Sequence, residues 1–214
     1  MFILEEVFKS KKAEHSDYFN LRIHRGLSWL KKSLELDSDL DLKFMSLWIS
    51  FNAIYAQDIA FNQDKQTFRQ FLYLICQKDR EHKIYHVLWD KFSQPIRLLL
   101  ENPYVYQEFW DYQNQKISQH SWKEGFEQEK KKVHKALQEK ASVDILFIVF
   151  NRLYTLRNQI IHGGATYNSS VNRRQLQDAC NILAALLPTF IFVLLENAHS
   201  LDLGKPFYPV VQVC

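Results

Sequence analysis

The chain has 214 residues, 47% of them hydrophobic, and this length lets a folded chain bury roughly 70% of its unfolded surface without disulfides or a structural metal. Only five glycines and five prolines are present, where average usage would give roughly 15 and 10, which argues against a turn-rich fold and favours long helices. The formal charge of +3 permits nucleic-acid binding but does not require it.

Glycine and cysteine spacing argues against several classes of site. No glycines match a dinucleotide-binding or phosphate-binding loop, so we expect no nucleotide cofactor. The three cysteines lie far apart without metal-ligand spacing, and the first residues lack a basic segment before an apolar one, which favours a reducing, cytoplasmic setting. The strongest apolar run, residues 182–195, is shorter than the roughly 17 to 25 residues of a membrane-spanning helix. We therefore interpret this run as a core helix and expect no membrane association.

The first two predicted helices are defined by their caps and their apolar residues. Ser16 or Asp17 caps the first. It has one apolar stripe with helical spacing, formed by Ile23, Leu27, Leu30 and Leu34. Its opposite side carries four basic residues, Arg22, Arg25, Lys31 and Lys32. Ser38 or Asp39 caps the second helix, which runs to Tyr55 and is apolar around most of its circumference, so we expect it to be central.

The middle of the chain is predicted to form shorter helices. Amphipathic stretches occupy residues 68–75 and 84–92, and Pro95 interrupts the second pattern. The pair Asn102-Pro103 provides a cap and a first-position proline for a further helical piece.

Three capping patterns predict the helices of the second half. Ser121 and Glu124 match a reciprocal capping box for a charged helix to about residue 140, whose thin apolar face places it outside the core. Ser142 caps the next helix, which ends at His162. A cap within residues 168–170 begins the last long helix.

These elements predict one all-α domain over residues 1–214. No alternating strand pattern, repeat or low-complexity linker is present. Residues from about 64 to 140 are expected to form a helical insertion or subdomain, and residues 200–214 an extended tail.

The helix that ends near residue 162 contains the clearest candidate for chemistry, because Arg157, Asn158 and His162 lie within six residues. At 100° per residue, Asn158 and His162 are about 40° and one turn apart, whereas Arg157 is about 140° from His162. The long Arg157 side chain can still curl toward the pair. Gly163 is the left-handed residue expected just past the helix end. The structural alternative is that His162 is a basic C-cap that satisfies the last carbonyls.

Arg157, Asn158 and His162 resemble the R-polar-x-x-x-H motif of HEPN domains, the higher-eukaryote and prokaryote nucleotide-binding helical bundles. Three other segments also resemble bacterial stand-alone members: Trp48 to Tyr55, which matches a W-x-x-F-N-A-x-Y helix, Gly163 to Arg174, and the ending Pro206 to Val211. Residues of about 64 to 140 are not matched.

The resemblance implies a helical bundle with a four-helix up-and-down core that forms a homodimer, so that two motifs meet in one cleft. Many such proteins are metal-independent endoribonucleases, often toxins of toxin-antitoxin or phage-defence systems with an antitoxin protein as partner. Others are noncatalytic nucleic-acid-binding or protein-interaction modules. Some members have a tyrosine two residues after the motif histidine that a partner nucleotidyltransferase modifies. Gly164 occupies that position here, so control by that route is not expected.

RNA cleavage by the 2'-hydroxyl needs a base, an acid and positive charge at the phosphorane, and histidine with arginine supplies all three when two subunits contribute. We expect His162 to be the base or acid and Arg157 to stabilise the phosphate. Asn158 would orient His162 or hydrogen-bond a phosphate or base. No metal or other cofactor is then required.

Further residues suggest RNA binding. Arg173, Arg174 and Ser169 are candidates to grip RNA, since a helix start favours phosphate, although an ordinary capped helix explains them equally well. Aromatic residues between 104 and 122 offer stacking surfaces, with packing as the expected use. The lysine cluster at 130–135 is interleaved with glutamates, which favours a solvated face.

One histidine pair has a spacing compatible with metal coordination. His82, His86 and Asp90 lie one turn apart in succession, but Lys83 stands where a zinc protease would have glutamate. We expect no metal there.

Overall fold

Ten α-helices make up the part of the chain that the computed structural model describes, which is residues 2–56, 64–206 and 208–209. In chain order they are α1 (Phe2–Lys11), α2 (Asp17–Leu34), α3 (Leu40–Tyr55), α4 (Asp64–Lys78), α5 (Lys83–His86), α6 (Ser93–Glu101), α7 (Gln107–Gln113), α8 (Gln119–Gln138), α9 (Ser142–Ile161) and α10 (Arg173–Glu196). Short 3-10 turns lie between α1 and α2, between α6 and α7 and after α10, and one π-helical turn, Val87–Lys91, lies between α5 and α6; no β-strand is assigned within the described residues. The all-α prediction is confirmed.

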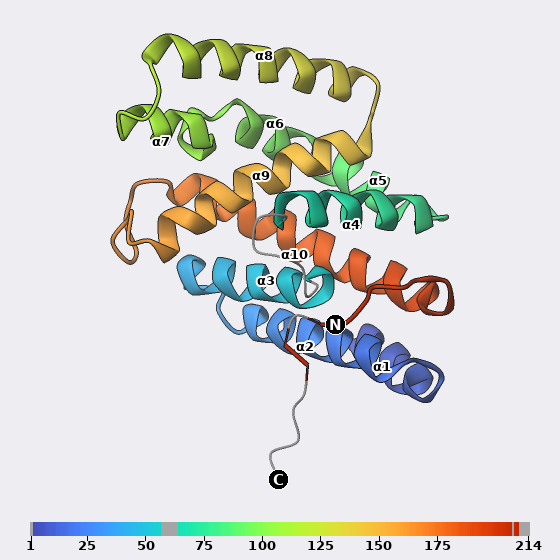
Figure 1. Ribbon diagram of the computed structural model, residues 1–214. Coiled ribbons are helices and arrows are strands. Elements are labelled where there is room, and N and C mark those ends of the chain that lie inside the picture. Colours follow the sequence, from blue (N-terminus) through green and yellow to red (C-terminus); the bar gives the residue numbers. More distant parts are fainter. Residues whose placement is uncertain (1, 57–63, 207, 210–214) are drawn as a thin grey trace.

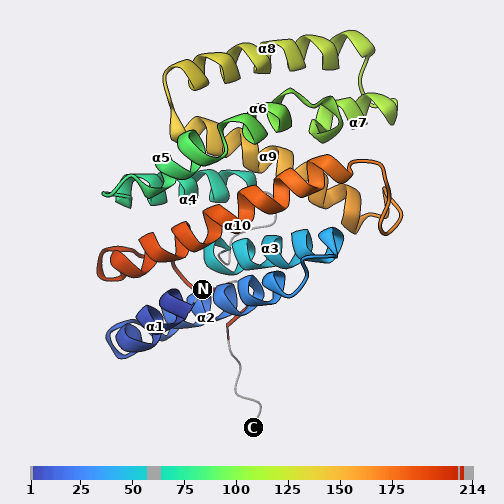
Figure 2. The ribbon, with the colours of Figure 1, turned by 180° about the vertical axis from the view of Figure 1, so that it is seen from behind.

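Four long helices, α2, α3, α9 and α10, alternate in direction through a helical bundle (Figure 1). α2 and α3 form a close antiparallel pair. Seen from behind, α10 runs across the middle of the molecule and contacts α3 and α2 on one side and α4, α5 and α6 on the other (Figure 2). Of these four helices, α2, α3 and α10 pack closely on one another, whereas α9 packs mainly on α4, α6 and α8.

The close packing of α2 on α3 depends on a glycine. A Cβ atom at Gly26 would lie 2.7 Å from Cγ2 of Ile54, a separation that real contacts essentially never reach. The Ser50 hydroxyl on α3 also donates to the Gly26 carbonyl over 2.7 Å. The buried face of α3, with Phe51 fully buried, confirms that this helix is central.

Some helices of residues 64–140 pack into the main core, and others lie at its outside. α4 contributes four buried residues to the main core, Phe68, Phe71, Leu72 and Ile75. Pro95, which interrupts the second amphipathic pattern, lies in the first turn of α6. The proline therefore stands at the start of a new helix, where it is tolerated. The Asn102 side chain caps the 3-10 turn that begins with Pro103, by accepting from the Tyr104 N–H. α8 forms the outer edge of the molecule, as its thin apolar face predicts (Figure 1).

The predicted caps are correct for α2 and α3 and wrong for three later helices. Ser16 accepts from the Phe19 N–H, and Asp39 accepts from the Leu42 N–H. α8 is capped by Ser118 and not by the box of Ser121 and Glu124, because the helix starts one turn earlier.

The other two wrong caps flank α9 and α10. Ser142 is the first residue of α9, and its hydroxyl instead accepts from the indole N–H of Trp89 over 3.1 Å. α10 starts after Asn172, which is left-handed at φ 62° and makes no side-chain cap, so the cap predicted within 168–170 is wrong. Helix α1 was not predicted at all.

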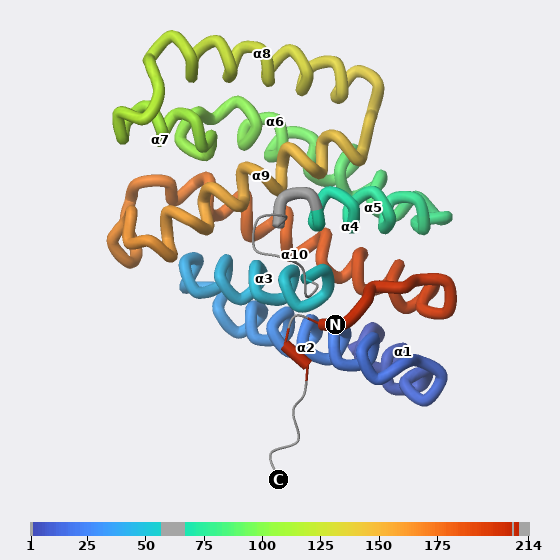
Figure 3. The backbone as a smooth tube through the Cα atoms, in the orientation of Figure 1, coloured from blue at the N-terminus to red at the C-terminus, as the bar shows by residue number. Residues whose placement is uncertain are grey.

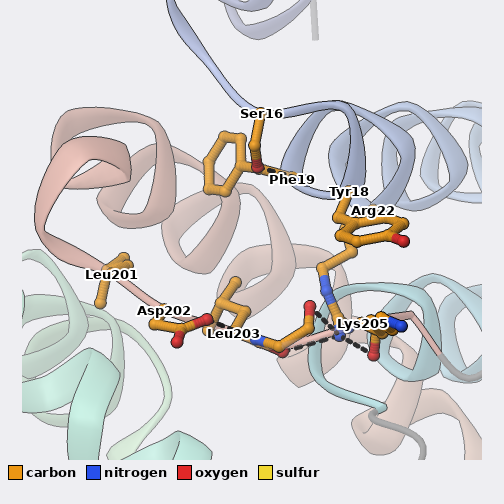
Figure 4. Close-up of a pocket in the computed structure, with 9 residues that line it drawn as sticks. Ser16, Tyr18, Phe19, Arg22, Leu201, Asp202, Leu203 and Lys205 are labelled. Atoms are coloured by element: carbon orange, nitrogen blue, oxygen red, sulfur yellow. Dashed lines mark hydrogen bonds between the residues drawn. The ribbon is translucent and has the colours of Figure 1, made fainter.

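The prediction of a solvent-facing basic side on α2 is wrong for Arg22, because the Arg22 side chain is fully buried. It reaches from α2 to the segment after α10, where its guanidinium donates to the carbonyls of Leu203 and Lys205 over 2.8 Å each (Figure 4). It also donates to the Ala56 carbonyl over 2.6 Å. Burial lowers the pKa of Arg22 to about 10.

The tail after residue 200 has no helix among its described residues, 201–206 and 208–209. A cavity of about 270 Å³ separates part of it from α2 (Figure 4). Phe207 and residues 210–214, which include part of the family-like ending, lie outside the described residues.

By length and composition, α10 is the one helix among the described residues that qualifies as a membrane span. Its qualifying stretch is 61% buried within the fold, and Leu183, Leu186 and Phe190 on it are fully buried. These contacts make α10 a core helix of the bundle, in agreement with the interpretation of the run at 182–195.

Candidate functional site

The end of α9 is fixed by a glycine pair. Gly163 is left-handed at φ 70°, as predicted, and its N–H donates to the Ile160 carbonyl over 3.2 Å. The Gly164 N–H donates to the Gln159 carbonyl over 2.7 Å. Together these bonds form a Schellman motif, which makes His162 the C-cap residue of α9.

The Arg157 side chain does curl toward Asn158. Its Nη1 donates to Asn158 Oδ1 over 2.9 Å, and the guanidinium carbon lies 5.9 Å from the ring centroid of Tyr154. Arg157 Nε is buried and has no hydrogen-bond partner. The side chains of Arg157 and Asn158 therefore form one hydrogen-bonded pair, in which the Nε–H of Arg157 has no acceptor.

His162 is exposed at the end of the helix. Its backbone N–H donates to the Asn158 carbonyl over 3.0 Å, whereas its ring has no hydrogen-bond or ion-pair partner within the part of the chain that the structure describes. Asn158 thus holds Arg157 and forms no hydrogen bond with the imidazole. The histidine is available to a ligand or to a second copy of the chain.

Two of the three predicted RNA-binding residues make contacts within the chain. Arg173 donates from Nη1 to Asp41 Oδ2 over 2.7 Å and from Nε to the Ser169 carbonyl over 2.9 Å. The Ser169 hydroxyl accepts from the Val171 N–H over 3.1 Å. Arg174 is exposed and has no ion-pair partner within 4.0 Å among the described residues. Of the two arginines, Arg174 is the one whose guanidinium has no ion pair among the described residues.

The loop between α9 and α10 lies against the start of α3 (Figure 3). The Tyr167 hydroxyl donates to Asp39 Oδ2 over 2.6 Å, next to the ion pair of Arg173 with Asp41. The Leu42 N–H, and then the Tyr167 hydroxyl, lower the pKa of Asp39. These contacts fix the loop that follows His162 and give both carboxylates, Asp39 and Asp41, a partner within the chain.

Gln159 is a structural residue of the site that the sequence analysis did not identify. Its Nε2 donates to the Tyr104 carbonyl over 2.7 Å, and its Oε1 accepts from Asn172 Nδ2 over 3.1 Å. It therefore joins the motif helix both to the 103–105 turn and to the start of α10. In the sequence, only its position beside Asn158 could have indicated that Gln159 belongs to the site.

A buried ion pair on α9 was also missed. Arg152 is 3% exposed and contacts Glu129 Oε1 on α8 at 2.5 Å, and its guanidinium lies over the rings of Tyr106 and Phe126. Burial raises the pKa of Glu129 and lowers that of Arg152. Glu129 therefore does not belong to the solvated face expected for α8, although Glu127 does, through an exposed pair with Lys130.

The remaining candidates have structural explanations. Phe109 and Tyr112 each pack on Trp122, with ring centroids 5.3 and 6.1 Å from it, which fits the packing role expected of the aromatic segment. Burial raises the pKa of both Cys76 and Cys180 to about 12, so neither is a reactive thiolate.

Of the two histidines with metal-like spacing, His86 makes a local contact with the third residue of the pattern. His86 Nδ1 lies 2.6 Å from Asp90 Oδ2. No group of three or more metal-binding side chains is present among the described residues.

Comparisons with family models, with curated proteins and with solved structures found no match to this chain.

Proposed function

We propose that the protein is a HEPN-like, metal-independent endoribonuclease with Arg157, Asn158 and His162 at its catalytic site. The observation that carries the proposal is the end of α9, where an exposed, unpaired imidazole follows an arginine held by the neighbouring asparagine. The family resemblance of the four sequence segments supports the same assignment. A toxin or phage-defence role, with an antitoxin as partner, follows from that resemblance.

The proposed reaction uses groups of this chain alone. His162 of one subunit removes the proton of the 2'-hydroxyl, and the 2'-oxygen attacks the phosphorus. The bond from phosphorus to the 5'-oxygen breaks, and the leaving oxygen takes a proton from His162 of the partner subunit. Arg157 neutralises the charge that develops on the phosphorane, and Asn158 positions Arg157.

The proposal requires a homodimer, because one motif offers one imidazole for two proton transfers. Apolar side chains near the motif are consistent with such an interface. Five are exposed on α2, α3, α9 and the loop after α9: Leu34, Leu42, Ile161, Tyr167 and Val171. Solvent-exposed apolar side chains that cluster at one end of a molecule are typical of interaction surfaces.

The test is incubation of the purified protein with total RNA in EDTA. We expect cleavage to products with 2',3'-cyclic phosphate ends. His162→Ala should lower the rate by about 10²- to 10⁴-fold, the usual value of a general acid or base. His24→Ala is the matched control, because His24 is also exposed but lies on α2.

RNA that stays intact with the wild-type protein, or cleavage that His162→Ala and His24→Ala affect equally, would contradict the proposal. Intact RNA with retained RNA binding would instead support the noncatalytic module.

A further inference from the structure

A half-exposed tyrosine ring stands on a backbone that is fixed by three hydrogen bonds. The Tyr104 N–H donates to Asn102 Oδ1 over 2.8 Å, and the Tyr104 carbonyl accepts from Gln159 Nε2 over 2.7 Å and from Trp110 Nε1 over 2.8 Å. The ring packs edge-on against Phe109, with centroids 5.3 Å apart, and remains 50% exposed. Its position is thus set before any ligand arrives.

The bond from Gln159 joins the backbone of Tyr104, which carries this ring, to the motif helix. Gln159 and His162 are three residues apart, which on a helix corresponds to about 60° around the axis and about one turn along it. Asn172 holds the other end of the Gln159 amide. The tyrosine turn, the last turn of α9 and the start of α10 therefore form one hydrogen-bonded unit.

An unpaired arginine lies next to the same turn. Arg174 and Asn102, the residue that accepts from the Tyr104 N–H, line one hollow of about 140 Å³ between α6 and α10. Asp178 also lines this hollow, and burial raises the pKa of its carboxyl although Arg174 opposes that shift. A flat aromatic face with a nearby guanidinium is the combination that binds a base and its phosphate in single strands.

We propose that Tyr104 stacks an unpaired nucleobase of the bound RNA, with Arg174 contacting the backbone phosphate of the same strand. The identity of the ligand as RNA rests on the proposed function. The faces of bases are available in loops and single strands and are covered in a duplex, so this site selects single-stranded RNA. Tyr104 would thus position the strand, while His162 and Arg157 act on it.

The experiment measures binding in the non-cleaving His162→Ala protein, so that it does not depend on activity. The probe is a fluorescein-labelled single-stranded RNA 12-mer, and the readout is fluorescence anisotropy. We expect Tyr104→Ala to weaken binding about tenfold, a typical loss for one stacked base. Tyr104→Phe and Tyr104→Trp should keep wild-type affinity, because the ring and the backbone bonds remain. A 2-aminopurine in the same RNA should be quenched by the parent protein and not by Tyr104→Ala.

Tyr73→Ala is the matched control, because Tyr73 is 52% exposed but lies on α4. Equal affinities of Tyr104→Ala and Tyr73→Ala, or equal binding of duplex and single-stranded RNA, would overturn the inference. Failure of the two proposals can be told apart. If the wild-type protein cleaves RNA while Tyr104→Ala binds normally, only the stacking inference fails. If binding depends on Tyr104 and no RNA is cleaved, only the proposed reaction fails.

Discussion

Arg22 has no carboxylate among its hydrogen-bond partners, although it is fully buried. A buried charge is costly unless hydrogen bonds replace the lost water, and here backbone carbonyls do so. Those carbonyls belong to the end of α3 and to the segment after α10, far from Arg22 in sequence. The residue therefore holds the tail and the α2–α3 pair together.

Replacement of Arg22 by methionine should lower the free energy of unfolding by about 2 to 4 kcal/mol, because it leaves buried carbonyls without donors. It should also release the tail, so that chymotrypsin cleaves after Leu203, which is buried in the folded protein, sooner. Urea denaturation and limited proteolysis measure the two effects.

Arg25→Met is the control for Arg22→Met. Arg25 donates to the Tyr208 carbonyl over 2.6 Å in an exposed contact, so its loss should cost less than about 1 kcal/mol. Equal losses for Arg22→Met and Arg25→Met would show that the buried bonds do not stabilise the fold.

Helical periodicity predicted the approach of Arg157 to Asn158, because both residues lie on one helix and their geometry is local. It could not predict the burial of Arg22. The partners of Arg22 lie up to 183 residues away, and a basic residue opposite an apolar stripe is ordinarily solvated. Local sequence contains no information on which distant backbone segment will cover that side. The same reason explains why Gln159 was missed, since Tyr104 is 55 residues away.

At the scale of elements, the helices were easier to predict than their boundaries. The caps of α2 and α3 were correct because Ser16 and Asp39 directly precede strong apolar periodicity. Ser118 was missed because the first turn of α8 has almost no apolar residues to mark where the helix begins. The hydroxyl of Ser142 packs against Trp89 from another element, which a capping rule does not consider.

The contact of α8 with α9 includes the ion pair between Arg152 and Glu129. Because the pair is buried, we expect the stability losses of the two single variants not to add up in the double variant. Glu129→Leu leaves Arg152 buried and unpaired, which should cost about 3 kcal/mol. The double variant Glu129→Leu with Arg152→Met should regain most of that stability, because no charge remains buried. A double-mutant cycle in urea measures the coupling.

The pair of Glu127 with Lys130 is the control on the same helix. Its side chains are 65% and 34% exposed, so loss of this pair should cost less than about 1 kcal/mol. Additive losses in the Arg152–Glu129 cycle would contradict the account of α8 as a helix held by a buried charge pair.

At the scale of the whole molecule, composition was enough to predict an all-α bundle, because few glycines and prolines and long apolar periodicities leave little room for another class. The division of residues 64–140 was less accessible. α4 packs into the core while α8 stays outside, and this depends on which apolar faces the other helices leave open. Sequence periodicity gives the faces of each helix but not their pairing.

The assembly predicted for the whole molecule is a twofold dimer that brings the ends of two α9 helices together. Ile161 precedes His162 and is 46% exposed, so a charge there would be desolvated in such an interface and harmless in a monomer. We expect Ile161→Glu to shift sedimentation from dimer to monomer and to lower RNA cleavage at least about 100-fold, while the helical circular-dichroism spectrum stays unchanged. The melting temperature should fall to a value that no longer depends on protein concentration, because the dimer contact no longer stabilises the fold. Ile3→Glu is the matched control, because Ile3 is 72% exposed on α1, away from the loop between α9 and α10 (Figure 1). A wild-type protein that sediments as a monomer while it cleaves RNA in single-turnover assays would contradict the dimer, and with it the assignment of base and acid to two copies of His162.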